Sequence, residues 1–128
     1  MSQGAVEAKV KEIQTKMEAE VAEIKKIESE YTKIFGAKQQ LQEKKSENEM
    51  VLTEISLMGP EANLYKLVGP IMAKQDVSDG KASVQARIEY IAKEIARMDG
   101  LEADFQGKVE EKRNAIIKLQ GEYRTFVQ

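Results

Sequence analysis

The chain has 128 residues, of which 20 are Lys or Arg and 22 are Asp or Glu, and it contains neither His nor Cys. Without Cys there is no disulfide framework, and without His the commonest general base and metal ligand is missing, so we expect no enzyme, no cofactor and no metal site. The two signs of charge are interleaved, which argues against a nucleic-acid-binding protein. No stretch approaches the roughly 20 apolar residues of a membrane span, and MSQGAVEAKV lacks the apolar core of a secretory signal.

Length favours one domain, residues 1–128, and the abundance of Glu, Lys, Gln, Ala and Ile is typical of long helices and coiled coils. The first predicted element is a helix over about residues 5–57 that carries an unbroken seven-residue repeat. Eleven of its fifteen a and d positions are apolar, which indicates a coiled-coil seam. The a positions are Val10, Met17, Ile24, Tyr31, Lys38, Lys45 and Leu52, and the d positions are Val6, Ile13, Glu20, Ile27, Ile34, Leu41, Asn48 and Ile55.

The segment SLMGPEANLYKLVGPIMAKQDVSDG, residues 56–80, interrupts this pattern and holds both prolines and three of the eight glycines. Gly59-Pro60 predicts the end of the helix, with the glycine free to adopt the left-handed cap. Two apolar runs flank Gly69-Pro70, and together they predict a β-hairpin over about residues 63–75 with a positive φ at Gly69. The turn type is left open.

Almost every residue of this predicted hairpin is apolar, so both of its faces are apolar. An isolated two-stranded hairpin is marginally stable in water. We therefore expect its edges and faces to join other subunits. The alternative is a hydrophobic cap tucked onto the protein's own helices, close to the off-seam residues Met50, Val51, Leu57 and Met58. The residues expected to mediate subunit assembly are Leu64, Tyr65, Leu67, Val68, Gly69, Pro70, Ile71 and Met72.

A second helix is predicted over about residues 77–127, with Asp76 as its N-cap and Asp79 in its first turn. Twelve of its fourteen assigned a and d positions are apolar. The a positions are Ile88, Ile95, Glu102, Val109, Ile116 and Tyr123, and the d positions are Val77, Val84, Ile91, Met98, Phe105, Lys112, Leu119 and Phe126. Four glycines, Gly36, Gly100, Gly107 and Gly121, all fall at position f, opposite the seam.

The two helices have matching lengths of about 50 residues, or about 75 Å at the helix rise. A chain that folds back at the hairpin pairs them without overhang, so the expected fold class is mainly α: a long antiparallel two-helix coiled coil with one β-hairpin between the helices. Pairing of each helix with another chain is the alternative. In one antiparallel alignment Lys44 meets Arg87, a pair of like charges, so the charges beside the seam do not settle the register. The polar residues within the seam either specify the register or extend to solvent.

With these parts in place, NLYKLVGPIMAKQD (residues 63–76) and ARIEYIAKEIAR (residues 86–97) resemble the β-class prefoldin subunits, and the resemblance covers nearly the whole chain. It implies a subunit of a hetero-hexamer of α- and β-class subunits, joined through their hairpins, with coiled coils whose free ends hold unfolded chains. It further implies a cytoplasmic, ATP-independent chaperone that captures actin- and tubulin-like clients and passes them to the group II chaperonin.

For the free ends, the resemblance favours client contact by apolar residues in the first turns of one helix and the last turns of the other. Residue by residue, the simpler interpretation is that they close the end of the coiled coil. These expected tip residues are Val6, Val10, Ile13, Met17, Val21, Ile116, Ile117, Leu119, Tyr123 and Phe126. The competing function is a structural coiled-coil adaptor or tether in a multi-subunit complex.

Overall fold

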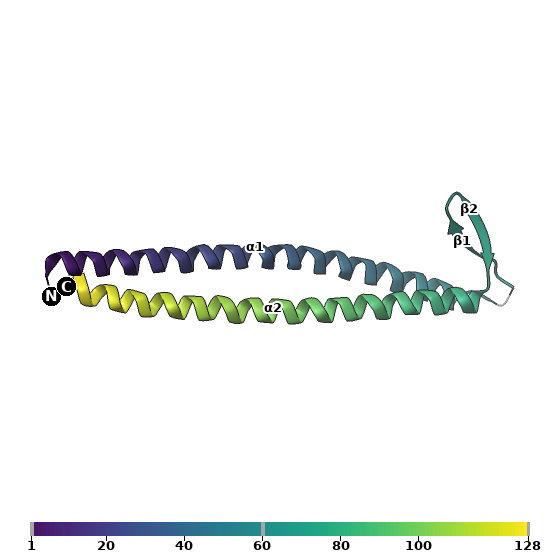
Figure 1. The fold of residues 1–128 in the computed structure, drawn as a ribbon. Coiled ribbons are helices and arrows are strands. Elements are labelled where there is room, and N and C mark those ends of the chain that lie inside the picture. Colours follow the sequence, from purple (N-terminus) through teal and green to yellow (C-terminus); the bar gives the residue numbers. More distant parts are fainter. Residues whose placement is uncertain (1, 60, 128) are drawn as a thin grey trace. The chain divides into compact units, whose positions relative to one another are not determined.

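The computed structural model of the protein describes residues 2–59 and 61–127. The elements follow in the order α1 (Gln3–Ser56), β1 (Leu64–Val68), β2 (Ile71–Gln75) and α2 (Val77–Val127). They form two compact units: unit 1 contains residues 2–35 and 100–127, and unit 2 contains residues 36–59 and 61–99. In each unit one stretch of α1 lies antiparallel beside one stretch of α2 (Figure 1). The predicted antiparallel two-helix coiled coil with one hairpin between its helices is confirmed.

The seam between the helices follows the predicted heptad positions. Every a and d position assigned from the sequence is buried or half-buried, including the six polar ones. The buried apolar residues of the described chain are all at d: Ile13, Ile27, Ile55, Val84 and Ile91. By contrast, a Cβ added at Gly36, Gly100, Gly107 or Gly121 would meet no atom within 4 Å, as expected for position f. The core is therefore a narrow seam of a and d side chains that is most deeply buried at d.

The first helix begins at Gln3, two residues before the expected start, because Ser2 caps it. The Ser2 hydroxyl accepts a hydrogen bond from the Ala5 amide at 3.1 Å, and the Ser2 carbonyl accepts one from Val6 at 3.0 Å. A serine in this position satisfies amides that the first turn leaves without partners.

The predicted left-handed cap at Gly59 is wrong, because Gly69 is the one glycine with a positive φ among the described residues. The last turn of α1 instead tightens: the Met58 amide donates to the Ile55 carbonyl at 3.1 Å, an i to i−3 bond. Such bonds satisfy terminal carbonyls without a left-handed residue. The other half of the predicted stop, Pro60, lies outside the described residues.

The hairpin has the predicted two-residue turn. β1 and β2 pair antiparallel from Leu64 opposite Gln75 to Val68 opposite Ile71, which leaves Gly69 and Pro70 as the loop. Gly69 has a φ of 59°, and the ring of Pro70 holds its own φ near about −65°. A positive φ at the first loop position followed by a negative one at the second is the pattern of a type II′ turn.

The second helix begins where predicted, and its first backbone hydrogen bond runs from the Gly80 amide to the Asp76 carbonyl at 2.9 Å. Asp76 is therefore the N-cap residue, and Asp79 lies in the first turn near the positive end of the helix dipole. Among the described residues, neither helix contains a stretch that is both long and apolar enough to cross a bilayer.

Candidate functional site

The two faces of the hairpin follow from its register. Residues directly opposite each other in an antiparallel pair point to the same face. Leu64, Val68 and Ile71 thus share one face with Lys66, Ala73 and Gln75. Tyr65, Leu67 and Met72 share the other with Lys74. Both faces are predominantly apolar, as the sequence predicts.

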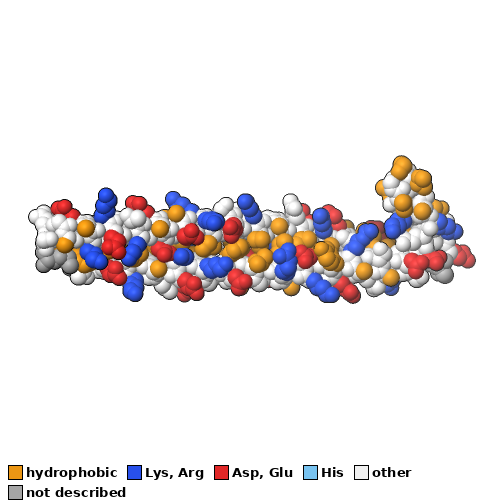
Figure 2. All heavy atoms as spheres, in the orientation of Figure 1, with side chains coloured by type: hydrophobic (Ala, Val, Ile, Leu, Met, Phe, Trp, Pro, Cys, Tyr) orange, Lys and Arg blue, Asp and Glu red, His pale blue; other side chains and the backbone are white. Residues whose placement is uncertain are grey.

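Neither face is covered by the rest of unit 2. Leu67, Ile71 and Met72 are 69%, 67% and 66% exposed, and Tyr65 and Val68 are at least half exposed. Figure 2 shows these apolar atoms gathered on the hairpin. The alternative of a cap tucked onto its own helices is therefore wrong for this chain by itself, because only Leu64 and Gln75, at the base, are half-buried.

The base of the hairpin is held where β1 meets the first turn of α2. Gly80 is buried, and a Cβ added to it would overlap Leu64 Cδ2 and approach Gln75 Oε1 to 3.4 Å. A glycine in a first helical turn is costly for helix propensity, and the close approach of Leu64 explains it. This contact was not predicted from the sequence, although a helical glycine immediately after the hairpin was a signal for it.

A groove of about 300 Å³ lies between the hairpin and the adjoining helix turns of unit 2. Its apolar lining comes from the seam residues Ile55 and Val84 and from side chains of β1. The lining residues are Val51, Ile55, Leu64, Tyr65, Lys66, Leu67, Gln75, Gly80, Ser83, Val84 and Arg87. We call this the hairpin groove.

A second groove of about 520 Å³ adjoins the hairpin groove, with which it shares Ser83 and Arg87. It is lined by Lys44, Asn48, Ser83, Ala86, Arg87, Tyr90 and Ile91, and we call it the basic groove. Lys44 from α1 and Arg87 from α2 both line this groove. Tyr90 is 65% exposed at this groove.

The expected tip residues all belong to unit 1, where the structure brings the first turns of α1 beside the last turns of α2 (Figure 1). Eight of the ten are seam residues, and they are half-buried or, for Ile13, 4% exposed. Val21 and Ile117 differ, because they lie off the seam and are 41% and 63% exposed. This end of the pair is therefore largely closed, and its exposed apolar surface lies on the flanks.

Polar seam residues form ion pairs across the helices. Lys112 Nζ lies 3.2 Å from Glu20 Oε2 in unit 1, and Lys38 Nζ lies 2.5 Å from Asp99 Oδ1 in unit 2. Each pair keeps part of both side chains exposed, so neither is a fully desolvated charge. The Glu20–Lys112 contact is an ion pair and not an aligned hydrogen bond, since Glu20 Oε2 has no hydrogen-bond partner.

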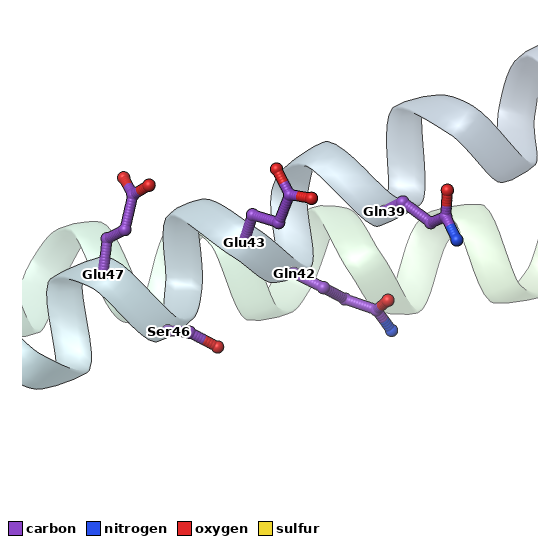
Figure 3. Close-up of a pocket in the computed structure, with 5 residues that line it drawn as sticks. All are labelled: Gln39, Gln42, Glu43, Ser46 and Glu47. Carbon is purple, nitrogen blue, oxygen red and sulfur yellow. The ribbon is translucent and has the colours of Figure 1, made fainter.

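A further, polar groove lies on the single helix α1. Gln39, Gln42, Glu43, Ser46 and Glu47 line a groove on α1, and Figure 3 shows all five side chains extending from that one helix without converging. Among residues 2–59 and 61–127 there is no cluster of three His, Cys, Asp or Glu side chains that could hold a metal ion.

Comparison with known proteins agrees with this geometry. The family model "Prefoldin subunit" matches residues 18–123. The chain is 36% identical to prefoldin subunit 6 of Arabidopsis thaliana over 117 residues, which cover 91% of both chains. It is 30% identical to prefoldin subunit 6 of Homo sapiens over 112 residues, covering 88% of this chain and 87% of the relative.

A crystal structure of the prefoldin beta subunit from Thermococcus strain KS-1 superposes with a TM-score of 0.74 at 21% identity, over 78% of this chain and 88% of that one. This likeness concerns the fold. The match to most of the sequence, together with two seam-packed helices and one exposed hairpin, shows that the chain belongs to the prefoldin subunit family of chaperone-complex components, which is not an enzyme family.

Proposed function

We propose that this protein is one subunit of a hetero-hexamer of α- and β-class prefoldin subunits that captures unfolded or nascent proteins without ATP. The observation that carries the assembly half of this proposal is the exposure of apolar side chains on both faces of the hairpin. Exposed apolar surface of this kind on a two-stranded sheet is stabilised by strand addition and by a partner's side chains. Family membership supports partners that carry similar hairpins.

Client capture is proposed for the helix ends in unit 1. The exposed flank residues Val21 and Ile117 supply apolar surface there, and fraying of the last turns adds the seam residues next to them. Aliphatic surface without a specific shape suits promiscuous contact with unfolded chains. The proposed clients are actin- and tubulin-like chains, and the proposed recipient is the group II chaperonin in the cytoplasm.

Photo-crosslinking tests the site of capture. A benzoylphenylalanine is placed at Ile117 or Val21, or at the exposed polar position Ser29 as a control, in the assembled complex without nucleotide. Diluted denatured actin should crosslink at Ile117 and Val21 and much less at Ser29, and the crosslinkable client should decrease when the chaperonin is added. Equal crosslinking at all three positions would contradict capture at the helix ends.

The closed seam of the tip favours a second candidate, a structural tether in which this end of the helix pair binds one folded partner. The half-buried seam residues at this end carry that alternative. A tether binds one partner saturably and shows no preference for denatured over folded actin. The same crosslinking experiment, repeated with folded actin, separates the two functions.

A further inference from the structure

The basic groove beside the hairpin carries unpaired positive charge. Lys44 and Arg87 line it together, and neither side chain has an ion pair among the residues that the structure describes. Lys66 lines the adjoining hairpin groove. No acidic residue lines either groove, although the chain contains 22 Asp and Glu residues.

Many Lys and Arg side chains on the described helices have no ion pair, so what distinguishes Lys44 and Arg87 is that they line one groove together without an acid. Other cations of the chain are paired. Lys16, Lys112 and Arg97 each lie within 4.0 Å of a carboxylate in the same unit. Two cations brought to one groove without an acid repel each other, and a carboxylate from another molecule would relieve that repulsion. Surface charges of one sign that are left uncompensated in a concave site favour a ligand of the opposite sign.

The groove also has the lining of a protein contact. Its floor contains Ile91, which is 8% exposed, and the half-buried Asn48 and Ser83, while Tyr90 stands exposed beside it. Tyr and Arg are enriched where proteins bind each other, because each joins apolar contact area to polar groups. The shared residues Ser83 and Arg87 make this surface continuous with the hairpin groove.

We infer that the basic groove is a second docking surface for the neighbouring subunit, which places a helix segment rich in Asp or Glu there while its hairpin covers the apolar residues. The apolar contact supplies most of the affinity, and the Lys44 and Arg87 contacts select which subunit binds on this side. This inference rests on the proposed assembly function, and it adds the chemistry that the neighbour must present.

Charge reversal tests the inference in the complex. The variant Lys44→Glu with Arg87→Glu is compared with Lys33→Glu with Lys93→Glu, which makes the same change in net charge at exposed positions outside both grooves. The dissociation constant of the labelled chain for the complex lacking it is measured by sedimentation at low and high salt. We expect the groove variant to bind at least about tenfold more weakly than the control variant at low salt. The difference in affinity should narrow at high salt because salt screens the charges. The variant Lys44→Gln with Arg87→Gln should have an intermediate affinity.

Equal affinity and salt dependence of the groove and control variants would overturn the inference, as would tighter binding by the groove variant. Unchanged assembly with weaker binding of denatured actin would assign the groove to clients and overturn it as well. Thermal unfolding of the isolated chain shows whether each variant still folds. If charge reversal lowers the unfolding temperature, the affinity of the Lys44→Gln with Arg87→Gln variant tests the inference instead. The hairpin variant Leu67→Asp with Ile71→Asp separates the two proposals, because normal assembly of that variant contradicts the assembly function itself.

Discussion

The helix ends of unit 1 and the hairpin of unit 2 both carry apolar side chains, but they bury them differently. At the helix ends the seven-residue spacing directs these side chains to one stripe, where Ile13 is 4% exposed. In the hairpin successive residues point to opposite faces, so its unbroken apolar runs place side chains on both faces, and Leu67 remains 69% exposed. A helix pair closes its stripe within one chain, whereas a two-stranded sheet has no second layer with which to cover itself. The hairpin therefore requires partners more strongly than the helix ends do.

The largest expected effect comes from placing charge on both faces of the hairpin. Leu67→Asp with Ile71→Asp should abolish incorporation into the complex, because each carboxylate would be desolvated against apolar surface of the neighbour. Sedimentation of the reconstituted complex measures the loss, and circular dichroism should show the helices retained. Lys33→Asp with Lys93→Asp, which places two carboxylates at exposed helix positions outside both grooves, is the control. Full incorporation of the first variant would mean that the hairpin does not assemble.

The seam of unit 1 should respond in the opposite way, with loss of stability and little direct effect on hairpin contacts. Ile13→Ala removes a buried side chain from a single-layer core and should lower the free energy of unfolding by about 3 kcal/mol. Thermal or urea unfolding of the isolated chain measures this change. Val21→Ala, at an exposed flank position, should change stability by less than about 1 kcal/mol. Equal effects at the two positions would contradict the closed seam.

The ion pair between Glu20 and Lys112 tests what the polar seam residues contribute. Replacing both by Leu should raise the free energy of unfolding by about 1–2 kcal/mol, because the pair is partly desolvated and an apolar pair packs at no such cost. Since the chain lacks Cys, engineered Cys pairs across the seam can report the register of the two helices without interference. A mixture of registers in the Leu variant, absent from the parent, would identify the pair as a register device.

A smaller gain is expected at the solvent side of the same unit. Gly107→Ala should stabilise the protein by about 1 kcal/mol, because alanine favours the helix and the added Cβ would meet no atom within 4 Å. Gly80→Ala is the informative contrast, since its Cβ would overlap Leu64 and displace the hairpin base. Thermal unfolding should therefore show opposite shifts for the two variants, and the same shift for both would contradict the close approach.

The smallest effect concerns pH. Lys16 and Lys9, within 3.1 Å and 3.7 Å of the Glu12 carboxylate, lower the pKa of Glu12 below its ordinary value of 4.5. A carboxyl whose pKa is lower in the folded state stabilises the protein above about pH 4.5, and this contribution disappears as the pH falls through the lowered pKa. Glu12→Gln should thus unfold at a slightly lower temperature than the parent at pH 7 and at the same temperature at pH 3. Because Glu12 is exposed, solvent screens the interaction and the difference will be small.

The heptad frame, the hairpin and its Gly69 turn, and the start of α2 were predictable from the sequence because each depends on local rules. Periodicity of 3.5 residues sets which side of a helix is buried, and a glycine before a proline sets the turn. The cap at Gly59 was predicted incorrectly, since a tightened last turn satisfies the same carbonyls and local sequence does not choose between the two.

Three features depended on contacts between distant residues. The structure decided that the hairpin leaves both faces open, that Leu64 packs against Gly80, and that Lys44 and Arg87 line one groove without an acid. From the sequence alone, the pattern of apolar residues determined that this chain forms a helix pair with a hairpin. Tertiary structure determined which surfaces remain uncovered, because exposure depends on how side chains from separate elements meet in space, and no local pattern encodes that.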